Sequence, residues 1–431
     1  SGKHILVLCR YSKGLNKQHE IKSHMEIKRR WYHPFSFSRE MFNVPFNIKM
    51  ISFVIFLYYL GWGMVSPFLP LYYKSILGSY TAVGLVTALL PLFALLIDIP
   101  AGGIINKVSK VWVIRIALLL YIPFSFFLLS LKNMFDFVLF RIYHSAVSTP
   151  FWISADSYAR ENAPKWKAAE SMSVYDVGGT LSLVIGPIIG GLLFVYFDFS
   201  LMYAISIFAG IALLATFFLK DGEVHEKTKD AVKELIFTDG VYKRAIIDFW
   251  QNKMLVKVYS FVFLFRFCMS FVAMLLPLFM KEFGASNLQI GLVFGIYYLP
   301  LLFEPYLSVY AKNKKLMTMG LALCAVLFVS LFANNQLGFI FIHAILLSLL
   351  FAAIIPMLNG RITELMPREQ IGELSGVGMM FSHVADFAGP IIAGVVSDAF
   401  GLRYMFIIGA VVAFALTLLS LRKSFRHVLF D

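Results

Sequence analysis

The sequence is divided into long apolar blocks, and this feature most limits how the chain can fold. Each block runs for about 18–25 residues, enough to cross the ~30 Å hydrocarbon core of a bilayer as a helix. In lipid every backbone polar group needs an internal partner, and the blocks lack the alternation of barrel strands. The sequence therefore predicts an all-α membrane protein with twelve transmembrane helices, at residues 50–73, 81–105, 111–131, 135–155, 172–197, 201–219, 256–279, 287–311, 316–333, 337–358, 376–400 and 404–421.

The charged residues indicate how these helices are oriented. They make up only 15% of the chain, against about 25% in soluble proteins, so a water-soluble fold is excluded. Of the 38 Lys and Arg residues, 32 fall on one side when alternate loops are assigned to two sides, and four fall on the other. The positive-inside rule places the rich side, with both termini, in the cytoplasm of a multi-pass plasma-membrane protein. The net charge of +13 is thus a topology signal and predicts no nucleic-acid partner.

Two repeated phrases divide the chain into halves. Gly186-Pro187-Ile188-Ile189-Gly190-Gly191 returns as Gly389-Pro390-Ile391-Ile392-Ala393-Gly394, and Val83-Gly84-Leu85 returns as Ile290-Gly291-Leu292. The repeats run in the same direction, as in transporters built from two parallel halves. We expect a cytoplasmic segment (1–48), a six-helix half (49–219), a cytoplasmic linker (220–255), a second six-helix half (256–421) and a cytoplasmic tail (422–431). The linker forms either an interfacial helix or a solvated connection.

The segment from Asp98 to Lys110 resembles the signature between helices 2 and 3 of the major facilitator superfamily. Gly102, Lys107 and Lys110 match its glycine and basic positions, whereas Asn106 replaces the usual aspartate. The resemblance implies a charge latch between the halves, weakened here by Asn106. It also implies that Asp156 pairs with the basic residues of this loop.

Gly186, Pro187, Gly190 and Gly191 resemble a helix 5 signature associated with proton-driven exporters of the same superfamily. The resemblance therefore favours an exporter with a site between helices 1, 4, 7 and 10. On physical grounds, small residues also let helices pack closely and proline interrupts the backbone ladder. We therefore interpret the two copies as helix-packing hinges, with Gly389, Pro390 and Gly394 forming the second.

Ionisable residues inside apolar helices cost ~2.5–3.5 kcal/mol or more to insert, so they mark functional sites. A carboxyl group in a low-dielectric site can take up and release a proton near neutral pH. Asp98, Glu304 and Asp386 are accordingly the candidates for proton coupling.

The competing interpretation is a set of fixed ion pairs, Asp98 with Arg141 and Glu304 or Asp386 with Arg266. His383 shares a helix face with Asp386, as a relay or as a simple hydrogen-bonding partner of a neighbouring helix. The candidates for the substrate cavity are Tyr59, Trp62, Arg141, His144 and Arg266.

Three classes of function are consistent with these sequence features. The preferred one is proton-coupled export of hydrophobic or amphipathic small molecules by alternating access. The others are proton-coupled uptake of a polar or anionic metabolite, anchored by Arg141 and Arg266, and a transporter-derived sensor that no longer transports.

No phosphate-binding Gly-x-x-x-x-Gly-Lys motif occurs, so an ATP-driven enzyme is not expected. The three cysteines predict free thiols, and no spacing indicates a metal or another cofactor. We expect a monomer in the lipid bilayer that binds its substrate and protons.

Overall fold

The computed structural model describes residues 44–105, 108–164, 168–220, 246–303, 314–334, 336–366, 371–422 and 425. Asn106, Lys107 and Glu304 lie outside the described residues, as do the N-terminal segment up to residue 43, linker residues 221–245 and tail residues 426–431. The described residues are almost entirely helical.

The first half consists of helices joined by short turns. Its elements are α3 (Phe46–Val65), η1 (Ser66–Phe68), α4 (Leu69–Leu77), α5 (Tyr80–Ile105), α6 (Lys110–Tyr121), α7 (Phe124–Leu129), α8 (Met134–Asn162), α9 (Ala168–Phe197), η3 (Asp198–Met202), α10 (Tyr203–Ala215) and η4 (Thr216–Phe218).

The second half repeats this pattern. Its elements are α13 (Lys253–Glu282), α14 (Asn287–Tyr298), η5 (Leu299–Phe303), α16 (Lys314–Ala333), α17 (Leu337–Leu365), α18 (Ile371–Phe400) and α19 (Tyr404–Leu421). In the linker, residues 246–251 are helical; Phe249 is buried against Tyr259 and Phe381, and Ile246, Ile247 and Trp250 are exposed. Its predicted role at the membrane surface stays a prediction.

The twelve predicted blocks correspond to these helices. Nine helical stretches of the described chain are long and apolar enough to cross a membrane, and one of them, Glu170–Phe218, contains both α9 and α10. Two further blocks fall below that threshold for visible reasons. Helix α8 carries several charged residues, and α14 with η5 is shorter, Asn287–Phe303. The prediction of an all-α, twelve-helix membrane protein is confirmed.

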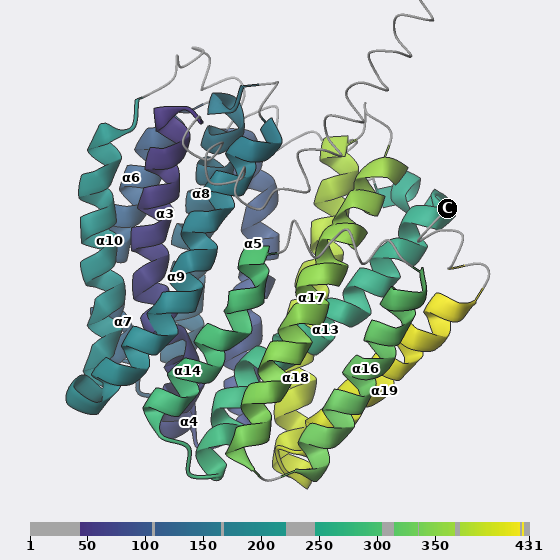
Figure 1. Ribbon diagram of the computed structural model, residues 1–431. Coiled ribbons are helices and arrows are strands. Elements are labelled where there is room, and N and C mark those ends of the chain that lie inside the picture. The colour runs from purple at the N-terminus through teal and green to yellow at the C-terminus, as the bar shows by residue number, and fades with distance from the viewer. Residues whose placement is uncertain are drawn as a thin grey trace, which may run out of the picture.

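Figure 1 shows the two halves side by side, the first in purple to teal and the second running from teal at α13 through green to yellow at α19. The most extensive contacts between them are those of α5 with α18 and of α9 with α14. We call the ends of the helices near residues 105–110, 303–314 and 366–371 the linker side, because the linker between the halves joins them there. The opposite ends, near Gly78, Gly284 and Gly401, form the far side.

On the far side the repeated glycines bring the two halves into backbone contact. A β-carbon added at Gly84 of α5 would lie 2.2 Å from the carbonyl oxygen of Pro390 in α18. A β-carbon added at Gly291 of α14 would lie 2.1 Å from the carbonyl oxygen of Pro187 in α9. The two repeated phrases of the sequence therefore meet each other across the interface, once in each direction. Only glycine allows such a close approach of two backbones.

Candidate functional site

Asp98 and His383 meet across the interface between α5 and α18. The imidazole Nε2 of His383 lies 2.9 Å from Oδ2 of Asp98, and the two side chains are 23% and 29% exposed. The other ring nitrogen, Nδ1, is buried without a hydrogen-bond partner among the described residues. A carboxylate of one half thus contacts a titratable group of the other.

One turn along α18, Asp386 pairs with Arg266 of α13 inside the second half. Nη2 of Arg266 donates to Oδ2 of Asp386 at 2.6 Å, and its Nε donates to Oδ1 at 3.4 Å. The Arg266 side chain is 47% exposed and that of Asp386 is 24% exposed, although both lie well inside long apolar helices. The pair is therefore formed at the wall of an open space.

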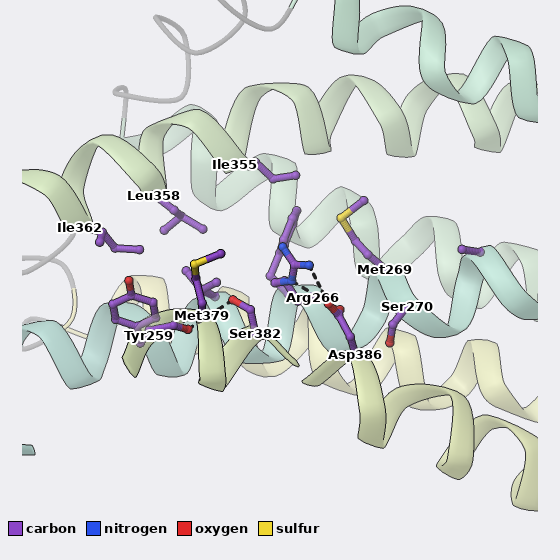
Figure 2. Close-up of a pocket in the computed structure, with 14 residues that line it drawn as sticks. Tyr259, Arg266, Met269, Ser270, Ile355, Leu358, Ile362, Met379, Ser382 and Asp386 are labelled. Atoms are coloured by element: carbon purple, nitrogen blue, oxygen red, sulfur yellow. Dashed lines mark hydrogen bonds and ion pairs between the residues drawn. The ribbon is translucent and has the colours of Figure 1, made fainter. Parts of the chain in front are cut away.

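That space is a cavity of about 570 Å³ on the linker-side half of α13, α17 and α18 (Figure 2). Arg266 and Asp386 are its charged lining residues, and Figure 2 shows their side chains pointing toward each other. Most of the remaining wall is apolar, with hydroxyl groups from Tyr259, Ser270 and Ser382. A volume of this order suits a small molecule.

Arg141 and His144 lie in the first half, where the structure encloses them. Both are only 4% exposed. Nε of Arg141 donates to the carbonyl oxygen of Val86 at 2.9 Å, and Nη2 donates to the hydroxyl of Tyr73 at 3.1 Å. Arg141 therefore ties α8 to α4 and α5. It does not pair with Asp98, whose described partner is His383.

Tyr59 and Trp62 belong to an aromatic cluster around this enclosed region. The Trp62 ring stacks on His144 with a centroid distance of 5.0 Å and an angle of 12°. Tyr59 packs on Trp152 at 4.9 Å. Of the five predicted cavity residues, Arg266 thus lines the described cavity. The other four gather around α3 and α8 in the first half, and their role in substrate binding stays a prediction.

The family model of the Major Facilitator Superfamily matches residues 51–279 and 258–427, which together cover both halves. The chain belongs to the Major Facilitator Superfamily. It is thus a multi-pass membrane transporter, and the resemblance inferred from the sequence is confirmed.

Individual relatives of the superfamily are distant. The staphylopine export protein of Staphylococcus aureus is 22% identical over 84% of this chain and 92% of its own. The quinolone resistance protein NorA of the same species is 22% identical over 82% and 90%. Among solved structures, a bacterial homologue of the lysosomal transporter Spinster, inward-facing and unoccupied, superposes with a TM-score of 0.70 at 14% identity, covering 90% and 98%. The nucleoside transporter NupG gives 0.69 at 16% identity, covering 89% and 99%. These structures establish the fold.

The loop signature of the superfamily is described only in part. Gly102 lies in the last turn of α5, whereas Asn106 and Lys107 lie outside the described residues. Nζ of Lys110 pairs with Glu161 of α8 at 2.8 Å. Asp156 instead pairs with Arg160, one turn along its own helix, at 2.7 Å. The start of α6 is thus tied to α8 through Glu161, a residue that no sequence motif marked.

The helix-packing glycines divide their contacts between the two halves. A β-carbon at Gly186 or Gly190 would meet the backbone of α3, at 2.8 Å from Gly63 and 2.0 Å from Met64. At Gly191 it would meet Asn287 of α14 at 2.8 Å. Gly389 and Gly394 repeat this arrangement, with Ser270 of α13 and Tyr80 of α5 as their neighbours at 2.0 and 2.4 Å. Each phrase therefore packs within its own half and against the other half.

A polar cluster on the far side was not predicted from the sequence. The carboxylate of Asp398, near the end of α18, accepts hydrogen bonds from the backbone N–H groups of Tyr80 at 2.9 Å and Thr81 at 2.7 Å. The hydroxyl of Tyr80 donates to Glu282 of α13 at 2.7 Å, and the Lys74 ammonium lies 3.6 Å above its ring. The available sequence signal was weak, because acidic residues near helix ends usually face water.

In the part of the chain that the structure describes, no group of three His, Cys, Asp or Glu residues is placed to hold a metal ion. Cys268 and Cys324 are free thiols buried in the second half.

Proposed function

We propose that this transporter is a proton-coupled exporter of hydrophobic or amphipathic small molecules. The observation that carries the proposal is the contact between Asp98 and His383, which links α5 of one half to α18 of the other. Transfer of a proton to Asp98 would remove its charge, and the attraction between the halves at this point would change. A proton can drive a conformational change only through such a difference in interaction between two states.

Two further features support proton coupling at this position. Nδ1 of His383 is buried and has no hydrogen-bond partner among the described residues, so the ring interacts with polar groups through its contact with Asp98. Asp386 follows His383 by three residues and lies on the same face of α18, at the wall of the cavity. A change at the Asp98–His383 contact would therefore reach the cavity through a single turn of one helix.

The direction of transport rests on other support. The relatives include a staphylopine export protein and the quinolone resistance protein NorA, whose names describe export and quinolone resistance. The mainly apolar lining of the cavity fits amphipathic substrates. We place the linker side in the cytoplasm of a cell membrane, because 32 of the 38 Lys and Arg residues belong to that side. We further propose that the protein acts as a monomer.

The test is proton flux in proteoliposomes containing a pH-sensitive dye in the lumen and an imposed pH gradient. Lipophilic cations, sugars and organic anions are added in turn to the wild type and to Asp98→Asn. We expect flux evoked by amphipathic compounds and its loss in Asp98→Asn. Asp136→Asn, which removes a carboxylate from the first turn of α8, is the matched control and should retain the flux. Unchanged evoked flux in Asp98→Asn would contradict the role of Asp98.

The two alternatives give different results in the same experiment. Uptake of a polar or anionic metabolite would differ in direction, because the added substrate would accumulate in the lumen under an inward proton gradient. A sensor would bind ligand without any evoked flux.

A further inference from the structure

Arg266 lines the cavity between α13, α17 and α18, and only some of its hydrogen-bond donors have a partner among the described residues. A guanidinium group has five N–H donors on two edges, each of which can hold a carboxylate. Within the described residues both hydrogen bonds of Arg266 go to Asp386, one from Nε and one from Nη2. The edge formed by Nη1 and the second hydrogen of Nη2 has no described partner, and the side chain is 47% exposed.

Asp386, in contrast to Arg266, has both of its carboxylate oxygens in hydrogen bonds. Its two oxygens each accept a hydrogen bond from the same guanidinium, at 2.6 and 3.4 Å, and its side chain is 24% exposed. The carboxylate is thus engaged on both oxygens, whereas the guanidinium keeps an unused edge. A cation entering the cavity would have to compete with Arg266, whereas an oxyanion can add to the pair without breaking it.

The walls of the cavity define the rest of the ligand. Ile355, Leu358 and Ile362 follow one face of α17 over two turns, which is ~10 Å along the helix. Met379 of α18 and Val262 of α13 add apolar surface, and Figure 2 shows Ile355, Leu358 and Ile362 facing the Arg266 region from the opposite side. An apolar body of that length fits between Arg266 and the linker-side end of the cavity.

We propose that this cavity binds amphipathic molecules that carry a carboxylate, with the carboxylate on the free edge of Arg266 and the apolar body against α17. The proposal rests on the proposed transport function and names its substrate class. Asp386 acts as the residue that holds the guanidinium in orientation, since an Arg fixed on one edge has less freedom to lose when its second edge binds.

The test is direct binding to the purified full chain in lipid nanodiscs by calorimetry. Three probes share one apolar body and differ in the polar group: 2-naphthylacetate, 2-naphthylacetamide and 2-naphthylethylammonium. We expect the wild type to bind the carboxylate at least about tenfold more tightly than the amide, as for a hydrogen bond to a charged group. The ammonium probe should bind most weakly.

Arg266→Gln combined with Asp386→Asn replaces the ion pair by a neutral hydrogen-bonded pair of similar shape, so the fold should be kept. It should abolish the preference for the carboxylate over the amide. Arg403→Gln, which removes a charge that lies over the Phe283 ring on the far side, is the matched control and should keep the preference. The proposal is wrong if the wild type binds the amide as tightly as the carboxylate. It is equally wrong if the ammonium probe binds best and is lost in Asp386→Asn.

Binding and flux separate the two proposals. Carboxylate-selective binding without evoked proton flux would refute the proposed transport mechanism and leave the site standing. Proton-coupled flux without carboxylate selectivity in binding would refute the site alone.

Discussion

The α-carbon of Gly84 faces the carbonyl oxygen of Pro390 so closely that an added β-carbon would lie 2.2 Å from it. Gly291 and Pro187 stand in the same relationship on the other side of the interface, at 2.1 Å. The far-side contact between the halves is therefore made largely of backbone, and any side chain larger than hydrogen must push it apart.

Gly84→Ala should weaken this closed interface, because the backbone of α18 must shift to admit the methyl group. We expect a loss of about 1–3 kcal/mol in stability, as for other overpacked sites. The measurement is the thermal midpoint of the purified protein, together with the labelling rate of Ser79→Cys by a membrane-impermeant maleimide. Gly210→Ala is the control, since a β-carbon there meets nothing within 4 Å in the described part of the chain. Gly210→Ala should not lower stability, because alanine has the higher helix propensity, and an equal loss in both variants would contradict the role of the interface.

Asp398→Asn should loosen the cap that α18 provides for α5. The carboxylate accepts from two backbone N–H groups, at 2.9 and 2.7 Å, and a neutral amide oxygen replaces this with one weaker acceptor. We expect a cost of about 1 kcal/mol, as for other N-caps, and faster far-side labelling of Ser79→Cys. Asp136→Asn, which weakens contacts at the start of α8 within one half, should lower stability without changing the labelling rate.

Arg141→Met should destabilise the protein, whereas Arg266→Gln should not. Removing Arg141 leaves the Val86 carbonyl and the Tyr73 hydroxyl without that donor in a buried site, and each unsatisfied group costs about 1–3 kcal/mol. Arg266 is 47% exposed, so water can solvate Asp386 when it is replaced. Thermal midpoints of the two variants in the same detergent test the difference. Equal midpoints would show that Arg141 is not the structural cation described here.

His383→Gln should keep a hydrogen bond to Asp98 while removing the titratable ring. The variant should therefore keep the two halves in contact but lose the substrate-evoked proton flux, because the ionisable partner of Asp98 is gone. The measurement is substrate-evoked flux at several pH values in proteoliposomes. His343→Gln is the control, since Nδ1 of that buried ring contacts the Phe339 carbonyl of its own helix, at 2.5 Å. Evoked flux that survives in His383→Gln would exclude this histidine from coupling.

The helices could be predicted from the sequence because the length of an apolar block in lipid already decides its structure. Asp386 with Arg266 was one of the stated pairings, and it forms. The partner of Asp98 could not be predicted in this way, since it depends on how α5 packs against α18 across the two halves. Asp398 and Glu282 escaped notice because acidic residues near helix ends are unremarkable in sequence. Their importance appears only when the opposite half supplies the donors.

Most of these contacts lie along one helix, α18. Its residues Asp398, Pro390, Asp386 and His383 meet, in that order, the start of α5, Gly84, Arg266 and Asp98. All four contacts lie on this one helix, with Pro390 between Asp398 and the other two residues, so a rotation of α18 about its axis would alter them together. Ligand binding, protonation and closure of the far side would then all depend on the same rotation of α18. A spectroscopic label on this helix would follow the whole cycle.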